Sequence, residues 1–274
     1  MAIAVSQLEV TTGALITHLA VTGAEDGHPL LLLHGTGPGA SGQASFEPLL
    51  GGLRGFRCLV PDLIGFAESS HPDNVPPGAG PWLQVRVDAV RRVLDELRIE
   101  RTHLLGHSYG CRVVFELLKR EPERFGKVVL IAAGGTPVTA NLQRLTDFYD
   151  NPTKHQMREM VLAQMSSDEV RDLDEYVSRR FALAERPEVR RSFESAMGPG
   201  EPAAVNDAAV LGTLKHEVLA VHGKADSTIP YAASLYLIDN LPSCDLHLFA
   251  HAGHQVQFEV PDVLATIISQ FIGT

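Results

Sequence analysis

The chain has 274 residues, of which 45% are hydrophobic and 20% are charged, a composition typical of globular proteins that excludes disordered and low-complexity classes. The formal net charge is −10, which argues against non-specific binding to nucleic acid or anionic lipid. Three cysteines far apart in the sequence argue against a disulfide framework and favour a reducing compartment, so we expect a cytoplasmic protein. We expect no secretory signal over residues 1–10, and no membrane span, because no apolar stretch approaches about 18 residues.

The hydrophobic pattern of the first half alternates between strands and helices. Strands are predicted at 15–21, 29–33, 56–60, 102–105 and 128–131. Several of these runs are wholly apolar, as is typical of strands covered on both faces of a parallel sheet. Apolar residues then recur at spacings of three and four between positions 83 and 97, and again after position 112, which predicts two amphipathic helices. This order predicts an open, doubly wound sheet, because parallel crossovers are right-handed.

The alternation stops in the middle of the chain. No strand is predicted over residues 137–212, which have the pattern of three or four helices, for example at 154–165 and 168–184. Strands resume at 218–221 and 246–249, and a helix is predicted at 261–271. We therefore expect an α/β core made of residues 1–136 and 213–274, with a helical lid over 137–212 inserted between the two parts.

A nucleophile candidate lies in Gly106-His107-Ser108-Tyr109-Gly110, which matches the pattern Gly-x-Ser-x-Gly. A predicted strand leads directly into the motif and a predicted helix leads directly out of it, as a nucleophile elbow requires. The alternative is an ordinary tight turn in which Ser108 only caps the helix. The context favours the nucleophile.

A serine hydroxyl needs a base, and the α/β-hydrolase chain order is serine, acid, histidine. Asp226 and His254 fit this order, and each follows a predicted strand. His254 would take the proton of Ser108, and Asp226 would orient the imidazole. The alternatives are a turn residue for Asp226 and a surface histidine for His254. We expect no metal site, because no cysteine or carboxylate completes a set with His247, His251 and His254.

The glycine-rich segment 34–40, His-Gly-Thr-Gly-Pro-Gly-Ala, follows the strand at 29–33. Its glycines let the backbone approach a ligand, so Gly35 and Gly37 are candidate substrate contacts. The backbone amides of Thr36 and Tyr109 could together form an oxyanion hole. A phosphate-binding loop is disfavoured, since no Gly-Lys-Ser/Thr follows and the glycine spacing differs from Gly-x-Gly-x-x-Gly.

Together these motifs resemble the α/β-hydrolase superfamily over nearly the whole chain. More narrowly, the chain is similar to the meta-cleavage product hydrolases, which hydrolyse a carbon–carbon bond in ring-opened aromatic metabolites. The narrower likeness lies in four segments: 34–40, Pro-Asp-Leu-Ile-Gly-Phe at 61–66, Leu-His-Leu-Phe at 246–249 leading to Gly253-His254, and Arg-Arg-Phe-Ala-Leu-Ala at 179–184. The resemblance implies a vinylogous 1,5-diketone acid as substrate, ketonisation of its dienol, acyl transfer to water, and no cofactor.

The resemblance also implies roles for individual residues. It places the arginine that grips the substrate carboxylate at Arg180, for which the alternative is a solvated helix charge. Three pocket positions depart from the family, which often has Asn, Asn and Trp where this chain has Ser45, His107 and Gln255. We therefore expect a working hydrolase whose preferred substrate is displaced from the usual one. His107 either donates a hydrogen bond to a substrate oxygen or is only a structural neighbour of the elbow.

The leading hypothesis is thus a cofactor-free carbon–carbon bond hydrolase acting on a small, carboxylate-bearing molecule. The alternative keeps the triad but cleaves an ester, lactone or thioester. A non-catalytic receptor on the same fold is disfavoured by the intact Ser-Asp-His set. We expect neither a nucleic acid nor a membrane as partner, and the resemblance suggests a homodimer or a larger homo-oligomer.

Overall fold

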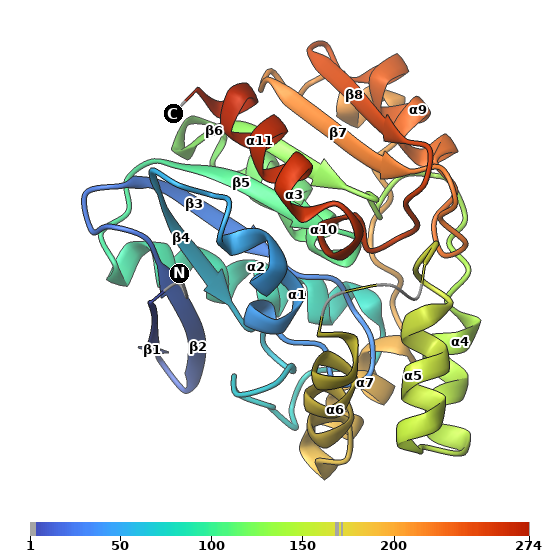
Figure 1. Cartoon of the computed structure of the whole chain (residues 1–274). Helices are drawn as coiled ribbons and strands as arrows, with labels where there is room; N and C mark the ends of the chain where they lie inside the picture. Colours follow the sequence, from blue (N-terminus) through green and yellow to red (C-terminus); the bar gives the residue numbers. More distant parts are fainter. Residues whose placement is uncertain (1–3, 168–169, 171, 274) are drawn as a thin grey trace.

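The computed structural model describes residues 4–167, 170 and 172–273 (Figure 1). Within these residues, eight strands form one sheet in the order β1-β2-β4-β3-β5-β6-β7-β8. The first two pairings, β1 with β2 and β2 with β4, are antiparallel, and all the others are parallel. The strand bounds are β1 Val5–Thr12, β2 Leu15–Thr22, β3 His28–Leu33, β4 Phe56–Pro61, β5 Thr102–His107, β6 Phe125–Ile131, β7 Val218–Gly223 and β8 Cys244–Phe249.

Helices cover both faces of the sheet because its central strands are apolar on both sides. In β3, Leu31 and Leu33 pack with α2 (Ala79–Glu96), α3 (Tyr109–Arg120) and α9 (Ala232–Asn240) on one face. Leu30 and Leu32 pack with α1 (Gly42–Leu50) and α11 (Pro261–Ile272) on the other face. A short helix, α10 (Val256–Glu259), precedes α11, and a 3₁₀ turn, η1 (Pro122–Arg124), precedes β6. This alternation follows from the period of two in a strand.

The segment between β6 and β7 is helical, and its first helices gather at one end of the sheet (Figure 1). Apolar residues of this segment, including Phe148, Met157 and Phe193, form a cluster of their own. The predicted helix at 154–165 ends earlier, at Leu162, and the one at 168–184 begins at Leu173; positions 168, 169 and 171 lie outside the described residues. The elements are α4 Gln143–Thr146, η2 Asp147–Asp150, α5 Lys154–Leu162, α6 Leu173–Ala184, α7 Pro187–Met197 and α8 Ala208–Leu211.

The predicted fold, a mostly parallel doubly wound sheet with a helical insertion, is confirmed. The strand β1 was not predicted, because most of its side chains are exposed and only Val10 and Thr12 are buried. It forms by pairing with β2 across a turn in which Gly13 has a φ of +66°, a value that favours glycine. Among the described helices, none combines the length and apolar character needed to cross a bilayer.

Candidate active site

Ser108 lies between β5 and α3 with a φ of 53° and a ψ of −114°, a strained conformation for a residue with a side chain. The neighbouring glycines make this turn possible. A Cβ at Gly110 would collide with the carbonyl oxygen of Leu33, and a Cβ at Gly106 would lie 2.9 Å from the amide nitrogen of Cys111. The sharp turn places the Ser108 hydroxyl at the carboxyl end of the sheet, at the beginning of α3.

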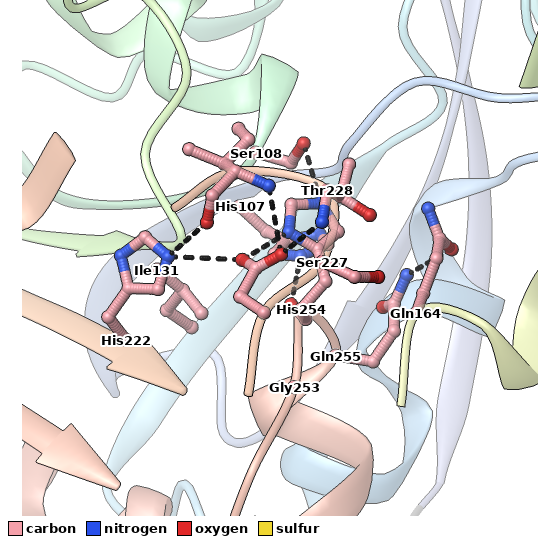
Figure 2. A network of polar contacts seen from close by, with 12 residues as sticks. His107, Ser108, Ile131, Gln164, His222, Ser227, Thr228, Gly253, His254 and Gln255 are labelled. Atoms are coloured by element: carbon pink, nitrogen blue, oxygen red, sulfur yellow. Dashed lines mark hydrogen bonds and ion pairs between the residues drawn. The ribbon is translucent and has the colours of Figure 1, made fainter. Parts of the chain in front are cut away.

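The structure brings the three predicted triad residues together (Figure 2). The Ser108 Oγ lies 2.9 Å from the Nε2 of His254, and the Nδ1 of His254 lies 2.8 Å from the Oδ2 of Asp226. Ser108 and His254 are buried, with exposed fractions of 6% and 2%. With the imidazole neutral, its Nδ1–H donates to Asp226 and its Nε2 accepts the Ser108 hydroxyl, the geometry that base activation of a serine requires.

Asp226 accepts four hydrogen bonds. Its Oδ1 accepts the amide N–H groups of Thr228, at 2.7 Å, and Ile229, at 2.9 Å. Its Oδ2 accepts from His254 and also from the Nε2 of His222, at 3.0 Å. Burial alone would raise the pKa of Asp226, but the charge of His254 and the hydrogen bonds from both imidazoles and the Ile229 amide outweigh it and hold this pKa well below its usual range. Asp226 is therefore a carboxylate at any working pH.

The segment 34–40 lies against the nucleophile. A Cβ at Gly35 would lie 3.1 Å from the Cβ of Ser108, so only glycine fits without displacing a neighbour. His34 anchors the segment, because its Nδ1–H donates to the Gly35 oxygen at 2.7 Å while its Nε2 accepts the Leu63 amide at 3.0 Å. Burial lowers the pKa of His34 to about 4, so this ring is neutral near pH 7.

The two predicted oxyanion-hole donors are the amides of Tyr109, which follows the nucleophile, and Thr36, which follows Gly35. Tyr109 is the first residue of α3, so its amide N–H has no acceptor within the helix. Thr36 lies between Gly35 and Gly37 in the glycine-rich segment. The N-terminal end of α3 adds a partial positive charge close to the nucleophile, which favours a developing oxyanion there.

Arg180 of α6 reaches the same segment from the helical insertion. Its guanidinium donates from Nε to the Pro38 oxygen at 2.8 Å and from Nη1 to the Tyr176 hydroxyl at 2.9 Å. The side chain is only 3% exposed, so Arg180 is not a solvated helix charge. Its Nη2 is buried and has no hydrogen-bond partner, and a Cβ at Gly37 would collide with it. A buried guanidinium nitrogen with a free donor is suited to an anionic group of a ligand.

The three positions that depart from the family have partners within the protein. His107 donates from Nε2 to the carbonyl oxygen of His254 at 3.0 Å, and burial, with the charge of His254, lowers its pKa to about 3. The ring is thus neutral, and its single N–H proton is already donated to the His254 carbonyl. This favours the structural role of His107 over donation to a substrate. The Ser45 hydroxyl, on α1, donates to the Ser41 oxygen at 2.6 Å. The Gln255 Nε2 donates to the Gln164 Oε1 at 3.0 Å.

Two further groups of contacts were not predicted from the sequence. The first is the second imidazole on Asp226, from His222. The signal was present, since His222 directly follows the strand predicted at 218–221 and lies four residues before Asp226, but a histidine there has many possible roles. The second group joins the end of α5 to the loops that carry Asp226 and His254.

The residues just after α5 hold both catalytic loops. The Ser227 hydroxyl donates to the Ala163 oxygen at 2.7 Å, next to Asp226. The His254 amide donates to the Gln164 oxygen at 2.7 Å, and Gln164 also contacts Gln255 through its side chain (Figure 2). The backbone of the helical insertion therefore fixes the loop that positions His254.

Glu259 of α10 completes this joint. Its Oε2 accepts the Gly253 amide at 2.6 Å, and its Oε1 accepts the amide and the hydroxyl of Ser166, each at 2.6 Å. The Ser166 hydroxyl also lies 2.7 Å from the His251 oxygen. One carboxylate thus bridges the residues after α5 and the loop before His254. We call these contacts of Ala163, Gln164, Ser166 and Glu259 the α5-end joint.

In the part of the chain that the structure describes, no group of three or more His, Cys, Asp or Glu side chains could hold a metal ion. His247 instead packs against Phe249, with ring centroids 4.4 Å apart.

The fold and the site together define a class of protein. Residues 28–261 match the family described as alpha/beta hydrolase fold, and the chain belongs to this family of enzymes. It is 32% identical over 272 residues to 2-hydroxymuconate semialdehyde hydrolase from Pseudomonas sp. (strain CF600), covering 96% of this chain and 93% of that protein.

Solved structures give the same result. The 2-hydroxy-6-oxo-6-phenylhexa-2,4-dienoate hydrolase from Rhodococcus sp. strain RHA1 matches with a TM-score of 0.90 and 30% identity, covering 99% of this chain and 100% of that one. A meta-cleavage product hydrolase from Pseudomonas fluorescens IP01 matches with a TM-score of 0.85 and 27% identity, covering 97% of each chain. The predicted resemblance to the meta-cleavage product hydrolases is therefore confirmed.

Proposed function

We propose that this enzyme hydrolyses a carbon–carbon bond in a ring-opened aromatic metabolite, a vinylogous 1,5-diketone acid. Relatives named for the hydrolysis of such compounds support the proposal over nearly the full length of the chain. The observation that carries it is the buried Arg180, whose unpartnered Nη2 lies beside Gly37 and offers a site for the substrate carboxylate. An ordinary ester has no such carboxylate to bind.

The proposed reaction has two stages. In the first, the dienol of the substrate is protonated on carbon and becomes a ketone, so that the carbon–carbon bond can later break with its electron pair delocalised as an enolate. In the second, His254 takes the Ser108 proton while Oγ attacks the carbonyl carbon, and the enolate leaves and is protonated. Water then hydrolyses the acyl-enzyme, with His254 as base, and a carboxylic acid and a free Ser108 result.

The other residues have supporting roles in this proposal. Asp226 keeps the His254 proton on Nδ1 and stabilises the imidazolium that forms. The amides of Thr36 and Tyr109 would donate to the oxyanion, where the loss of one donor typically costs about 3 kcal/mol of barrier. Gly35 and Gly37 would let the substrate approach closely, while Ser45, His107 and Gln255 would shape the pocket through the contacts described above.

Residues 137–212 are proposed to act as the lid, since Arg180 reaches the site from this segment. We also propose a cytoplasmic, homo-oligomeric enzyme. The edge strand β8 and the adjacent α9 support association, because Leu248, Leu235 and Ile238 are exposed there. Sedimentation of the purified protein would test this point, and a monomer at micromolar concentration would contradict it.

The test of the function is spectroscopic. Purified enzyme is mixed with a yellow dienolate ring-fission product and, separately, with p-nitrophenyl esters. Rapid bleaching of the dienolate with feeble ester turnover is expected, and the reverse pattern would favour an ester, lactone or thioester as the natural substrate. Ser108→Ala should abolish turnover of both; a variant that keeps the wild-type rate would overturn the serine mechanism.

A further inference from the structure

The ring of His222 connects Asp226 to helix α9. His222 lies near the end of β7 and is 0% exposed. Its Nε2 is 3.0 Å from the Oδ2 of Asp226 and 2.9 Å from the carbonyl oxygen of Ile229 (Figure 2). Both of these oxygens are acceptors, so Nε2 carries the proton. With the single proton on Nε2, the Nδ1 accepts the hydroxyl of Ser234, at 2.8 Å.

A continuous chain of hydrogen bonds follows from these contacts. It runs from Ser234 through His222, Asp226 and His254 to Ser108. The acceptors Asp226 and Ile229 fix the proton of His222 on Nε2, and the Ser234 hydroxyl supports this tautomer by donating to Nδ1. Ser234 is also 0% exposed, so no solvent competes for this hydrogen bond.

We propose that His222 is a positioning residue for the hydrolysis proposed above, holding the Asp226 carboxylate in place and moderating its charge, with Ser234 orienting the His222 ring through its hydrogen bond to Nδ1. The inference rests on the role of Asp226 in that proposed function. His222 donates to the same carboxylate oxygen as His254 does. A second donor on this oxygen withdraws charge from it, so Asp226 stabilises the imidazolium of His254 less strongly than a carboxylate with one donor would.

Few groups contact the Asp226 carboxylate and so determine how strongly its charge acts on His254. The titratable groups in contact with Asp226 are His222, from β7, and His254, from the loop after β8. The other contacts of Asp226 are the amide N–H groups of Thr228 and Ile229. His107 packs against the His254 ring at a centroid distance of 4.9 Å, and the charge of His254 is one of the causes that keep it neutral. Removing His222 therefore directly increases the negative charge that the Asp226 carboxylate presents to His254.

The experiment compares His222→Leu, His222→Gln and Ser234→Ala. In the Leu variant, kcat/KM should fall about 10- to 100-fold, the effect of losing one hydrogen bond to a charged group. The acid limb of its pH profile should move to higher pH, because the less neutralised Asp226 favours the imidazolium. The Gln variant can donate to Asp226 from its amide and should recover most of kcat. Ser234→Ala should lose about threefold to tenfold, the effect of one neutral hydrogen bond.

The control is His103→Leu, a partly buried histidine of β5 whose Nδ1 accepts the Lys127 amide at 3.0 Å, away from the triad. It should leave the acid limb unmoved. An unmoved limb in His222→Leu, or equal losses in the Leu and Gln variants, would overturn the proposal. If thermal melting shows that His222→Leu does not fold, a Ser234→Ala enzyme with wild-type kcat/KM overturns it instead.

A second readout separates this inference from the proposed function. The Nδ1 proton of His254, hydrogen-bonded to Asp226, is followed by low-field proton NMR without substrate. In His222→Leu its resonance should move downfield, since Asp226 becomes a stronger acceptor. An unshifted resonance contradicts the role of His222 whatever the substrate is. Failure of the dienolate assay, with the resonance shifted, contradicts only the proposed substrate class.

Discussion

At the scale of single residues, Arg180 combines burial with an incomplete set of hydrogen bonds. Two of its nitrogens are held by Pro38 and Tyr176, and the third has no partner. Fixing the guanidinium in this way reduces the entropy lost when a carboxylate binds, because the donor is already oriented. The adjacent Arg179 is half-exposed and pairs with Glu47 at the surface.

This contrast gives a prediction for Arg180→Gln. We expect kcat/KM for a carboxylate-bearing dienolate to fall about 10- to 100-fold, the effect of losing a charge-assisted hydrogen bond, while turnover of neutral p-nitrophenyl esters changes little. Steady-state kinetics on both substrates provide the measurement. Arg179→Gln is the matched control and should leave both rates near wild type. Equal losses on the two substrates in Arg180→Gln would remove its assignment to the carboxylate.

At the scale of elements, the α5-end joint ties the helical insertion to the loop that carries His254. The carboxylate of Glu259 connects the two sides of this joint, because it accepts the amide of Gly253 on one side and the amide of Ser166 on the other. Hydrogen bonds to a charged acceptor are stronger than neutral ones. Because these bonds act on the loop before His254 and not on the core of the sheet, their loss should loosen that loop more than it destabilises the fold.

We therefore expect Glu259→Gln to lower kcat about tenfold with little change in KM, because the position of the base changes while the substrate contacts on Arg180 remain. The effect would be measured by steady-state kinetics, and thermal unfolding would show that the fold persists. Asp262→Asn, an exposed change at the start of α11, serves as the control. A rise in KM with an unchanged kcat would show that the joint shapes the pocket and not the base.

The elements also show how far the sequence can predict this molecule. The strands that carry Ser108 and Asp226 were predictable because β5 and β7 are almost wholly buried and each reaches a glycine at its end, Gly106 and Gly223. The strand before His254, β8, is not buried, and it was predictable from the alternation of Leu246, His247 and Leu248. Strand β1 was not, because an exposed edge strand such as Val5–Thr12 has no regular apolar pattern. The α5-end joint was not either, since Ser166 meets His251 and Glu259 across 85 and 93 residues of sequence, a pairing that only the tertiary fold creates.

At the scale of the whole molecule, two buried neutral histidines affect the stability of the fold against acid. The pKa is lowered by burial to about 4 in His34 and to about 3 in His107. In the unfolded chain both would titrate near their usual value of about 6.5. Below that value the unfolded state therefore binds more protons than the folded state. The free energy of unfolding that the two neutral rings contribute is fully present above about pH 6.5 and is lost as the pH decreases toward 4.

A single substitution should reduce this dependence. In His107→Asn the slope of the free energy of unfolding against pH, between pH 6 and pH 4, should decrease by about 1.4 kcal/mol per pH unit, the effect of one proton. Urea unfolding at several pH values would measure it. Ser108→Ala changes the adjacent residue without removing the titrating group and should keep the wild-type slope. The prediction fails if the slope is the same in His107→Asn and the wild type.

The position of β8 at the edge of the sheet has a consequence for the biosynthesis of the enzyme. Ser108 follows a central strand, whereas His254 follows β8, which pairs only with β7 in the sheet. Because synthesis begins at the N-terminus, a growing chain acquires its nucleophile long before its base. The base is then positioned only when β8 has paired with β7, and pairing between strands far apart in sequence is slow. Hydrolytic activity should therefore appear late on the ribosome, after β8 has docked. Activity itself then reports the completion of folding, and partly synthesised chains stay chemically inert.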